Sequence, residues 1–248
     1  MAMIKKRISE CCKKLRLSQN IAENYETIEA DNQHEYLLKV LEHEANYREV
    51  TRVNRLINQA KFNTLKTFDD YIFDNIKIPS EISIDDLKTA SFIDEKKNLV
   101  LYGNVGTGKT HLATAIGIEA CKRSKKVLFF RTASLVNQLN QAKKKDMLGK
   151  LFKKIDKAEL IICDEWGYVP LDRDGSQLLF QVISDCYEKK SVVITTNLEF
   201  SKWVNIFYDE QMTAAMIDRI VHHSHLLIFD GESYRIKNSL MKGDESSI

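Results

Sequence analysis

Proline and glycine are scarce in this 248-residue chain, and residues 1–66 contain neither. Both residue types interrupt helices, so their absence leaves a long stretch without its usual breakers. Apolar residues recur there at helical spacing among charged ones, namely at Leu37, Leu38, Leu41, Ala45 and the run from Tyr47 to Val53. This pattern predicts a small all-helical domain over residues 1–66.

Cysteine pairs and long apolar runs are also missing. The five cysteines are Cys11, Cys12, Cys121, Cys163 and Cys186. They form no C-x-x-C pair, so neither a disulfide framework nor a zinc ribbon is indicated. No apolar run approaches the ~20 residues that span a bilayer, and residues 1–7 lack the apolar stretch of a secretion signal. We therefore expect reduced thiols, no membrane association and a cytoplasmic protein.

The charge of the chain is unevenly distributed. Hydrophobic residues make up 44% and charged residues 29% of the sequence, as in proteins that bury a core, and the net charge is only +2. Residues 121–157 hold twelve Lys or Arg against Asp146 and Asp156, a local charge of +10, which leaves −8 for the rest of the chain. Because a polyanion meets the local surface potential, this segment predicts a surface that can hold a phosphate backbone.

One stretch fits a phosphate-binding pattern and has the expected flanks. Residues 103–110, Gly103-Asn104-Val105-Gly106-Thr107-Gly108-Lys109-Thr110, match G-x-x-x-x-G-K-[ST], the Walker A loop. A buried-strand pattern at residues 98–102 precedes it, and residues 111–121 carry apolar side chains at helical spacing. A glycine turn that binds nothing would rarely have both flanks, so we predict a nucleotide-binding loop.

The chemistry gives each loop position a role. The glycines allow a tight turn in which backbone N–H groups and the positive end of the following helix point at phosphate oxygens. Lys109 can reach the β- and γ-phosphates as a point charge, and the Thr110 hydroxyl can ligand the magnesium ion between them. All eight loop residues and the next one, His111, are therefore the expected nucleotide contacts, with ATP and magnesium as cofactors.

Apolar strands alternate with helices after the loop. Further strands are predicted at residues 126–131, 159–163 and 191–195, and helices at 133–142, 148–155 and 176–187. This order indicates an α/β fold in which a parallel sheet is covered by helices on both faces. A change to aromatic and loop character predicts a linker near residues 62–75, which gives domains over 1–66 and 67–248.

Polar residues directly follow two of these strands. Asp164 and Glu165 stand at the carboxyl end of the strand at 159–163, where parallel sheets hold ligands. Asp164 would hold magnesium beside Thr110, and Glu165 would orient and deprotonate the water that attacks the γ-phosphate. The alternative for this pair is a turn and helix cap. Asn197 follows the strand at 191–195 and would hydrogen-bond that water or the γ-phosphate, whereas alone it would be only a turn residue.

Several segments together carry a family resemblance. They are the Walker A loop, residues 162–170 (Ile-Cys-Asp-Glu-Trp-Gly-Tyr-Val-Pro), 194–198 (Ile-Thr-Thr-Asn-Leu), 218–222 (Asp-Arg-Ile-Val-His), 14–17 (Lys-Leu-Arg-Leu) and 65–68 (Leu-Lys-Thr-Phe). Roughly the whole chain resembles the IstB family, the ATP-binding helpers of transposases. The resemblance implies a P-loop AAA+ ATPase preceded by a helical domain, related to DnaC-like helicase loaders and DnaA initiators.

The resemblance also implies further site residues. Arg219 would be an arginine finger that completes a neighbouring subunit's site, which requires a homo-oligomer. Its alternative is a surface arginine paired with Asp218 or another carboxylate. Tyr71 lies where the family has aromatic residues and would contact adenine, although core packing explains it equally well. The family segment at residues 231–235 makes Arg235 a candidate phosphate contact.

The function implied by the resemblance is ATP-dependent, largely sequence-independent assembly on duplex DNA, with recruitment or stimulation of a partner transposase. The turn of Lys143, Lys144 and Lys145 is then the expected DNA contact, its alternative being a solvated helix end. The basic start of the chain, from Lys5 to Arg16, could serve DNA or a partner protein, or form a solvated face. A DnaC-type helicase loader, which touches single strands, is the alternative function, and a nucleotide kinase fits poorly.

Overall fold

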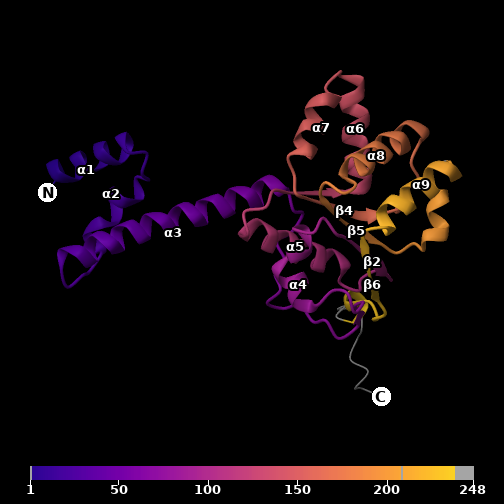
Figure 1. Cartoon of the computed structure of the whole chain (residues 1–248), viewed down its shortest axis with the longest axis horizontal. Coiled ribbons are helices and arrows are strands. Elements are labelled where there is room, and N and C mark those ends of the chain that lie inside the picture. Colours follow the sequence, from indigo (N-terminus) through magenta and orange to yellow (C-terminus); the bar gives the residue numbers. More distant parts are fainter. Residues whose placement is uncertain (1, 208, 238–248) are drawn as a thin grey trace, which may run out of the picture. The chain divides into compact units, whose positions relative to one another are not determined.

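The chain forms two compact units (Figure 1). The computed structural model describes residues 2–207 and 209–237, and the units divide in sequence between Arg55 and Leu56. The sequence-based domain boundary after residue 66 rests on composition and stays a prediction. Among the described residues, no helix combines the length and the apolar character that a membrane crossing requires.

The first unit is helical. Its elements are α1 (Ala2–Lys14), α2 (Asn20–Asn24), a 3-10 turn (Tyr25–Thr27) and most of α3 (Gln33–Ala60). Its described buried apolar residues are Cys12, Ile21 and Ala22. Glu44 is buried with them, at 4% exposure, and accepts hydrogen bonds from the Ser18 backbone N–H at 2.8 Å and from the Ser18 hydroxyl. This carboxylate therefore ties the turn between α1 and α2 to α3.

The second unit is built on a six-stranded sheet in the order β1-β6-β2-β5-β4-β3. Its strands are β1 (Ile76–Lys77), β2 (Asn98–Gly103), β3 (Val127–Arg131), β4 (Leu160–Trp166), β5 (Ser191–Thr196) and β6 (Ser224–Phe229). All neighbouring pairs are parallel except β1 with β6. Since β2 lies inside the sheet, the loop that follows it is delivered to the carboxyl edge, where such sheets bind ligands.

Helices cover both faces of the sheet (Figure 1). One face carries α4 (Ile84–Thr89) and α5 (Lys109–Lys122), and the other carries α6 (Thr132–Lys144), α7 (Leu148–Asp156), α8 (Arg173–Cys186) and α9 (Glu210–Val221). Shorter helical turns are Ser91–Ile93, Phe200–Asn205 and α10 (Tyr234–Lys237). Along β2, Leu99 and Leu101 pack on the α5 side and Val100 packs on the α6–α9 side. Burial of both strand faces accounts for the continuous apolar runs in the sequence.

The predicted α/β architecture is confirmed, including the parallel sheet covered on both faces and the helical region before it. Two strands had no sequence prediction. β1 has only two residues, and β6 fully buries only Leu227 and Phe229 of its six residues. Both strands therefore carry a weaker hydrophobic signal than β2 to β5, which are buried along most of their length.

Candidate nucleotide-binding site

The loop between β2 and α5 is closely packed at its glycines. A Cβ atom on Gly103 would lie 2.4 Å from the Phe229 carbonyl oxygen, and one on Gly106 would lie 2.1 Å from the Ser233 hydroxyl. Gly106 also has a φ of +82°, which residues with a side chain rarely adopt. The loop leads into the first N–H groups of α5, which have no partner within the helix. Such a turn is suited to hold a phosphate group.

The Lys109 side chain folds over this loop. Its ammonium group donates to the carbonyl oxygens of Gly103 (2.7 Å) and Asn104 (2.5 Å) and lies 3.4 Å from the Thr107 hydroxyl. Burial lowers the pKa of Lys109 to about 8, while the charge of Asp164 opposes the shift. Burial disfavours the ammonium form, and a phosphate bound beside Lys109 would favour that form again.

Asp164 lies beside Thr110 at the carboxyl end of β4. The Thr110 hydroxyl donates to Asp164 Oδ1 at 2.8 Å, and the Thr195 hydroxyl donates to the same oxygen at 2.6 Å. Asp164 is 2% exposed, and its backbone carbonyl accepts a hydrogen bond from the Thr132 hydroxyl at 2.9 Å. Carboxylate and hydroxyl oxygens are the hard ligands that magnesium takes, so the chemistry of Thr110 and Asp164 fits this ion.

Glu165 has an unusual backbone conformation. Its φ is +58°, at an irregularity in the pairing of β4 with β5 between Cys163 and Trp166. Its N–H donates to the Thr195 hydroxyl at 3.0 Å, and its carboxylate lies 3.6 Å from Arg131 Nε at the end of β3. A bulge re-aims a side chain, and a strained non-glycine residue often marks a functional site. Here the Glu165 side chain is 43% exposed, so water can reach its carboxylate.

Asn197 lies at the same sheet edge. It follows β5 directly and is exposed. Because β4 and β5 run parallel, with Trp166 opposite Thr196, the residues that follow both strands lie at the same carboxyl edge of the sheet. The fold thus brings the loop, the two carboxylates and Asn197 to one edge.

Three residues of this edge had no sequence prediction: Thr195, Thr132 and Arg131. Each stands at or next to the end of an apolar strand, as Asp164 does. A polar residue at the end of a strand is a candidate site residue. Its nearness to Asp164 can be inferred only once β3 and β5 are known to flank β4. The sequence alone does not give the strand order.

Tyr71 and His111 pack beside the loop. The Tyr71 hydroxyl would lie 3.5 Å from a Cβ atom on Gly108. The Tyr71 ring meets His111 and Phe73 edge-on, with centroid distances of 4.9 and 5.0 Å, and His111 Nε2 lies 2.7 Å from the Thr67 carbonyl oxygen. Burial raises the pKa of Tyr71. Tyr71 belongs to an aromatic cluster and also borders the loop, so adenine contact and core packing both stay open.

The segment after β6 closes on the loop. The Tyr234 N–H donates to the Gly106 carbonyl oxygen at 3.0 Å, and the Asp230 N–H donates to the Asn75 carbonyl oxygen at 3.1 Å. Arg235 is exposed, and its charge contributes to the lowered pKa of Lys109. This effect is a repulsion between two cations, and Arg235 stays a predicted phosphate contact.

Arg219 lies on α9, on the opposite face of the sheet from α5. Its guanidinium carbon lies 4.8 Å from the centroid of the Phe180 ring on α8. Its Nη1 is buried and has no hydrogen-bond partner among the described residues. A buried donor without a partner is costly, so this nitrogen would gain from an acceptor supplied from outside the described chain.

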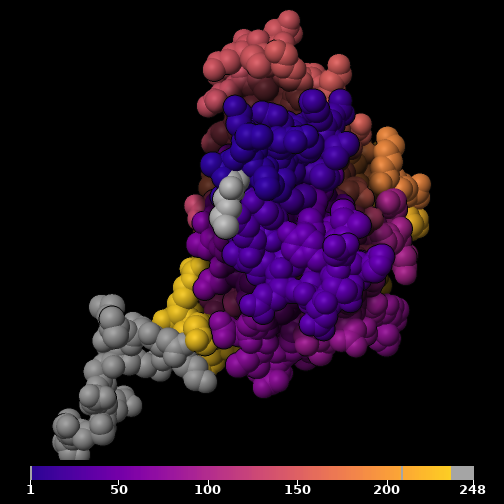
Figure 2. Space-filling model, turned by 90° about the vertical axis from the view of Figure 1, so that its left-hand side faces the viewer, coloured from indigo at the N-terminus to yellow at the C-terminus, as the bar shows by residue number. Residues whose placement is uncertain are grey.

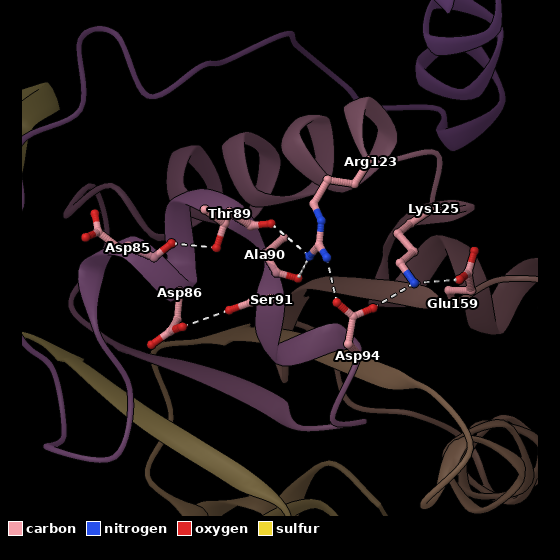
Figure 3. A network of polar contacts seen from close by, with 9 residues as sticks. All are labelled: Asp85, Asp86, Thr89, Ala90, Ser91, Asp94, Arg123, Lys125 and Glu159. Atoms are coloured by element: carbon pink, nitrogen blue, oxygen red, sulfur yellow. Dashed lines mark hydrogen bonds and ion pairs between the residues drawn. The ribbon is translucent and has the colours of Figure 1, made fainter.

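The basic segment at residues 121–157 contains paired and unpaired cations. Arg123 donates to Asp94 at 2.6 Å, and Lys125 bridges Asp94 at 2.8 Å and Glu159 at 3.1 Å (Figure 3). Lys143 lies 3.3 Å from Asp174. These pairs reduce the free charge near β3 and at the end of α6.

Within residues 121–157, the cations that form no ion pair with any described residue are Lys126, Lys144, Lys145, Lys150, Lys153, Lys154 and Lys157, all exposed. Most of them lie at the end of α6 and along α7. In α7, Leu148, Leu151 and Phe152 pack against the core, so the lysines occupy its solvent side. We call the set from Lys144 to Lys157 the α7 lysine surface.

The chain matches known proteins along most of its length. The family model "IstB-like ATP binding protein" matches residues 12–242. A protein of Geobacillus stearothermophilus, named as an ATP-binding protein of insertion sequence IS5376, is 36% identical over 248 residues and covers 98% of both chains. One of Bacillus thuringiensis subsp. berliner, named for insertion sequence IS232, is 34% identical over 211 residues, which are 85% of this chain and 84% of that protein.

Solved structures show the same fold. The AMPPCP-bound DnaA from Aquifex aeolicus superimposes with a TM-score of 0.55 at 19% identity, over 76% of this chain and 58% of that one. DnaI superimposes with a TM-score of 0.53 at 18% identity, over 72% of this chain and 92% of that one. At these identities the likeness concerns the AAA+ fold alone. Family model, relatives and sheet-edge geometry agree, and the chain belongs to the family of IstB-like ATP-binding proteins.

Proposed function

We propose that this protein is an ATPase that assembles on duplex DNA when ATP is bound and that recruits or stimulates the transposase of its insertion element. The observation that carries the proposal is the meeting of Thr110, Asp164 and Glu165 at the edge where the Lys109 loop ends. The names of the relatives, ATP-binding proteins of insertion sequences, supply the transposition context.

The site residues divide the work of ATP hydrolysis. Loop N–H groups and the Lys109 ammonium would hold the phosphates, and Thr110 with Asp164 would hold a magnesium ion, which would neutralise phosphate charge. Glu165 accepts the proton of the attacking water, and Asn197 orients that water or the γ-phosphate. The exposed carboxylate of Glu165 next to the buried one of Asp164 supports this division, since only Glu165 is accessible to water.

Assembly is proposed to depend on Arg219. Its buried Nη1 has no hydrogen-bond partner within the described residues, and the phosphate of a neighbouring subunit's site would supply one once the side chain turns outward. A finger that acts in trans makes hydrolysis depend on an oligomer. ATP would then join subunits, and hydrolysis would release them.

Duplex DNA is proposed to lie on the lysines at the end of α6 and along α7. Lys144 and Lys145 are exposed and form no ion pair with any described residue, while Lys143 would have to exchange Asp174 for a phosphate. Ammonium contacts to phosphates carry no base information, so binding by this surface is largely independent of sequence. A preference for duplex over single-stranded DNA in the presence of ATP would distinguish this function from that of a helicase loader.

The decisive test is Glu165→Gln, which keeps the side-chain shape and removes the base. We expect ATP and DNA binding to persist and turnover to be lost, so that the variant stays locked on duplex DNA. Glu119→Gln, the same change on α5 outside the site, should behave as the parent does. Unchanged ATP hydrolysis by Glu165→Gln would remove Glu165 from the mechanism.

A further inference from the structure

We propose that an arginine-lined groove in the first unit binds the phosphate backbone of duplex DNA. The groove has a volume of about 400 Å³ and lies between the turn after α1 and one side of α3. Its arginines are Arg16, Arg48, Arg52 and Arg55, and no acidic residue is among the described residues that line it. The inference rests on the proposed DNA binding and adds a second contact surface, outside the ATPase unit. Figure 2 shows the face on which residues of the first unit, in indigo and dark purple, are exposed.

Three of the arginines form a row on α3. Arg48, Arg52 and Arg55 are spaced i, i+4 and i+7, so they share one side of the helix. At a rise of ~1.5 Å per residue the row extends over about 10 Å. Each strand of a duplex carries one phosphate per ~3.4 Å of its axis, so about three phosphates fall within that length. The row thus matches a stretch of phosphate backbone in length, and Arg55 is its member without a carboxylate partner in the described first unit.

The groove is held in place by a buried carboxylate. Glu44 accepts hydrogen bonds from Ser18 and from Arg48 Nε, the latter at 2.6 Å. Arg48 in turn donates through Nη2 to the Arg16 carbonyl oxygen. Arg48 therefore links the turn after α1 to α3 through its own hydrogen bonds.

Two arginines remain for a ligand. Arg52 is paired with Glu49, whereas Arg16 and Arg55 form no ion pair within the described first unit. Four guanidinium groups against Glu44 and Glu49 leave a net charge of +2 on the groove and its partners. We assign the phosphate contacts to Arg16 and Arg55.

The backbone at Arg16 supports this assignment. Its φ is +56°, at the end of α1, where the left-handed position is usually occupied by glycine or asparagine. An arginine bears a steric cost there that glycine would avoid. Arg16 is exposed and lines the groove, so its side chain is available to a ligand there. Tyr47, 44% exposed in the same groove, offers a ring and a hydroxyl to sugar or phosphate.

The test compares two charge-matched double variants of the full chain. Arg16→Gln with Arg55→Gln removes the two groove cations that form no ion pair in the described first unit. Lys5→Gln with Lys6→Gln removes two exposed cations of the same unit that lie outside the groove and likewise form no ion pair there. Affinity for duplexes of unrelated sequence is measured with ATP across a salt series. Loss of two phosphate contacts should flatten the slope of log affinity against log salt by about 1.8, alike for every sequence.

Two measurements make the outcome interpretable. Arg16→Lys with Arg55→Lys keeps both charges and should retain the parental slope, and ATP binding without DNA should be the same in all variants. A parent that fails to bind duplex DNA overturns the proposed function and this inference together. If the parent binds duplex DNA but Arg16→Gln with Arg55→Gln keeps the parental slope, the groove proposal alone is overturned. The same holds if the control that changes two lysines outside the groove to glutamine flattens the slope equally. A loss confined to single-stranded DNA overturns the duplex assignment.

Discussion

The nucleotide-binding edge and the α7 lysine surface differ in how their charged groups are placed: the edge has a buried, hydrogen-bonded carboxylate, and the surface has exposed lysines. Asp164 is 2% exposed and receives two hydroxyl donors on one oxygen, at 2.6 and 2.8 Å. Lys144 and Lys145 are exposed and unpaired within the described residues. Phosphoryl transfer requires atoms at fixed positions, whereas binding a phosphate backbone requires mainly charge density. Substitutions should therefore have large, position-specific effects at the edge and small, graded ones on the surface.

The largest effect is expected from Arg219→Ala. As a finger that acts in trans, Arg219 should be dispensable for nucleotide binding, while its loss lowers the ATP turnover rate on the order of 10³-fold or more. A mixture of Arg219→Ala and Lys109→Ala subunits, each inactive alone, should regain activity. In mixed assemblies, the intact Walker A loop of an Arg219→Ala subunit can lie next to the intact Arg219 of a Lys109→Ala subunit.

The control for mixing is Arg219→Lys combined with the same Lys109→Ala partner. It keeps the charge but loses the planar fork, so it tests whether the geometry of the guanidinium matters. Mixtures that stay inactive at every ratio would place Arg219 outside the shared site. The edge would then be complete within one subunit.

A smaller effect is expected from Thr195→Val. The change keeps the shape and removes a hydroxyl that donates to Asp164 and accepts from the Glu165 N–H. Leaving the Glu165 N–H unpaired costs about 1–3 kcal/mol of stability. Magnesium-dependent ATP hydrolysis should also fall, because Asp164 loses one of its two hydroxyl donors and the backbone of Glu165 loses its acceptor. Thermal unfolding and ATPase rates measure the two consequences.

Thr196→Val is the matched control. Its hydroxyl is also buried, donating to the Trp166 carbonyl oxygen at 2.9 Å and accepting from the Leu198 N–H at 3.1 Å. Its loss should lower stability to a similar extent while leaving ATP turnover of the folded protein near the parental rate. Equal turnover losses in both variants would mean that Thr195 acts only through stability.

The same contrast explains what the sequence could predict. The loop, Asp164 and Glu165 follow a motif because their chemistry fixes residue types at fixed spacing, and the four buried strands follow from their apolar runs. Thr195 and Arg131 escaped prediction because their contacts with Glu165 depend on which strands flank β4. The bulge at Glu165 has no sequence signal of its own.

Charge gave a coarser prediction. The count of +10 over residues 121–157 is correct, but it does not tell which cations are neutralised across elements. Arg123 and Lys125 are held by Asp94 and Glu159, which lie about 30 residues away from them in the sequence (Figure 3). Only the fold reveals that the unpaired lysines gather on α7, beyond the turn that the sequence singled out.

The smallest effect per residue is expected from changing Lys143, Lys144 and Lys145 to Ala. Each phosphate contact contributes about −0.9 to the slope of log affinity against log salt, so the triple change should flatten the slope by up to ~2.7 per bound subunit. Lys143 should contribute least, since Asp174 already lies 3.3 Å from it. Duplexes of different sequence should be weakened alike, and ATP binding without DNA should be untouched.

The control removes the same charge elsewhere, by changing the exposed Lys88, Lys189 and Lys202 to Ala. If this control flattens the slope as much as the change of Lys143, Lys144 and Lys145 does, DNA affinity depends on the total charge of the protein. The lysines after α6 are then not a specific DNA-binding surface. If neither triple variant changes the slope, the turn after α6 is a solvated helix end. The DNA contacts must then be sought along α7 or in the first unit, because a salt-dependent affinity requires cations that release counterions somewhere on the chain.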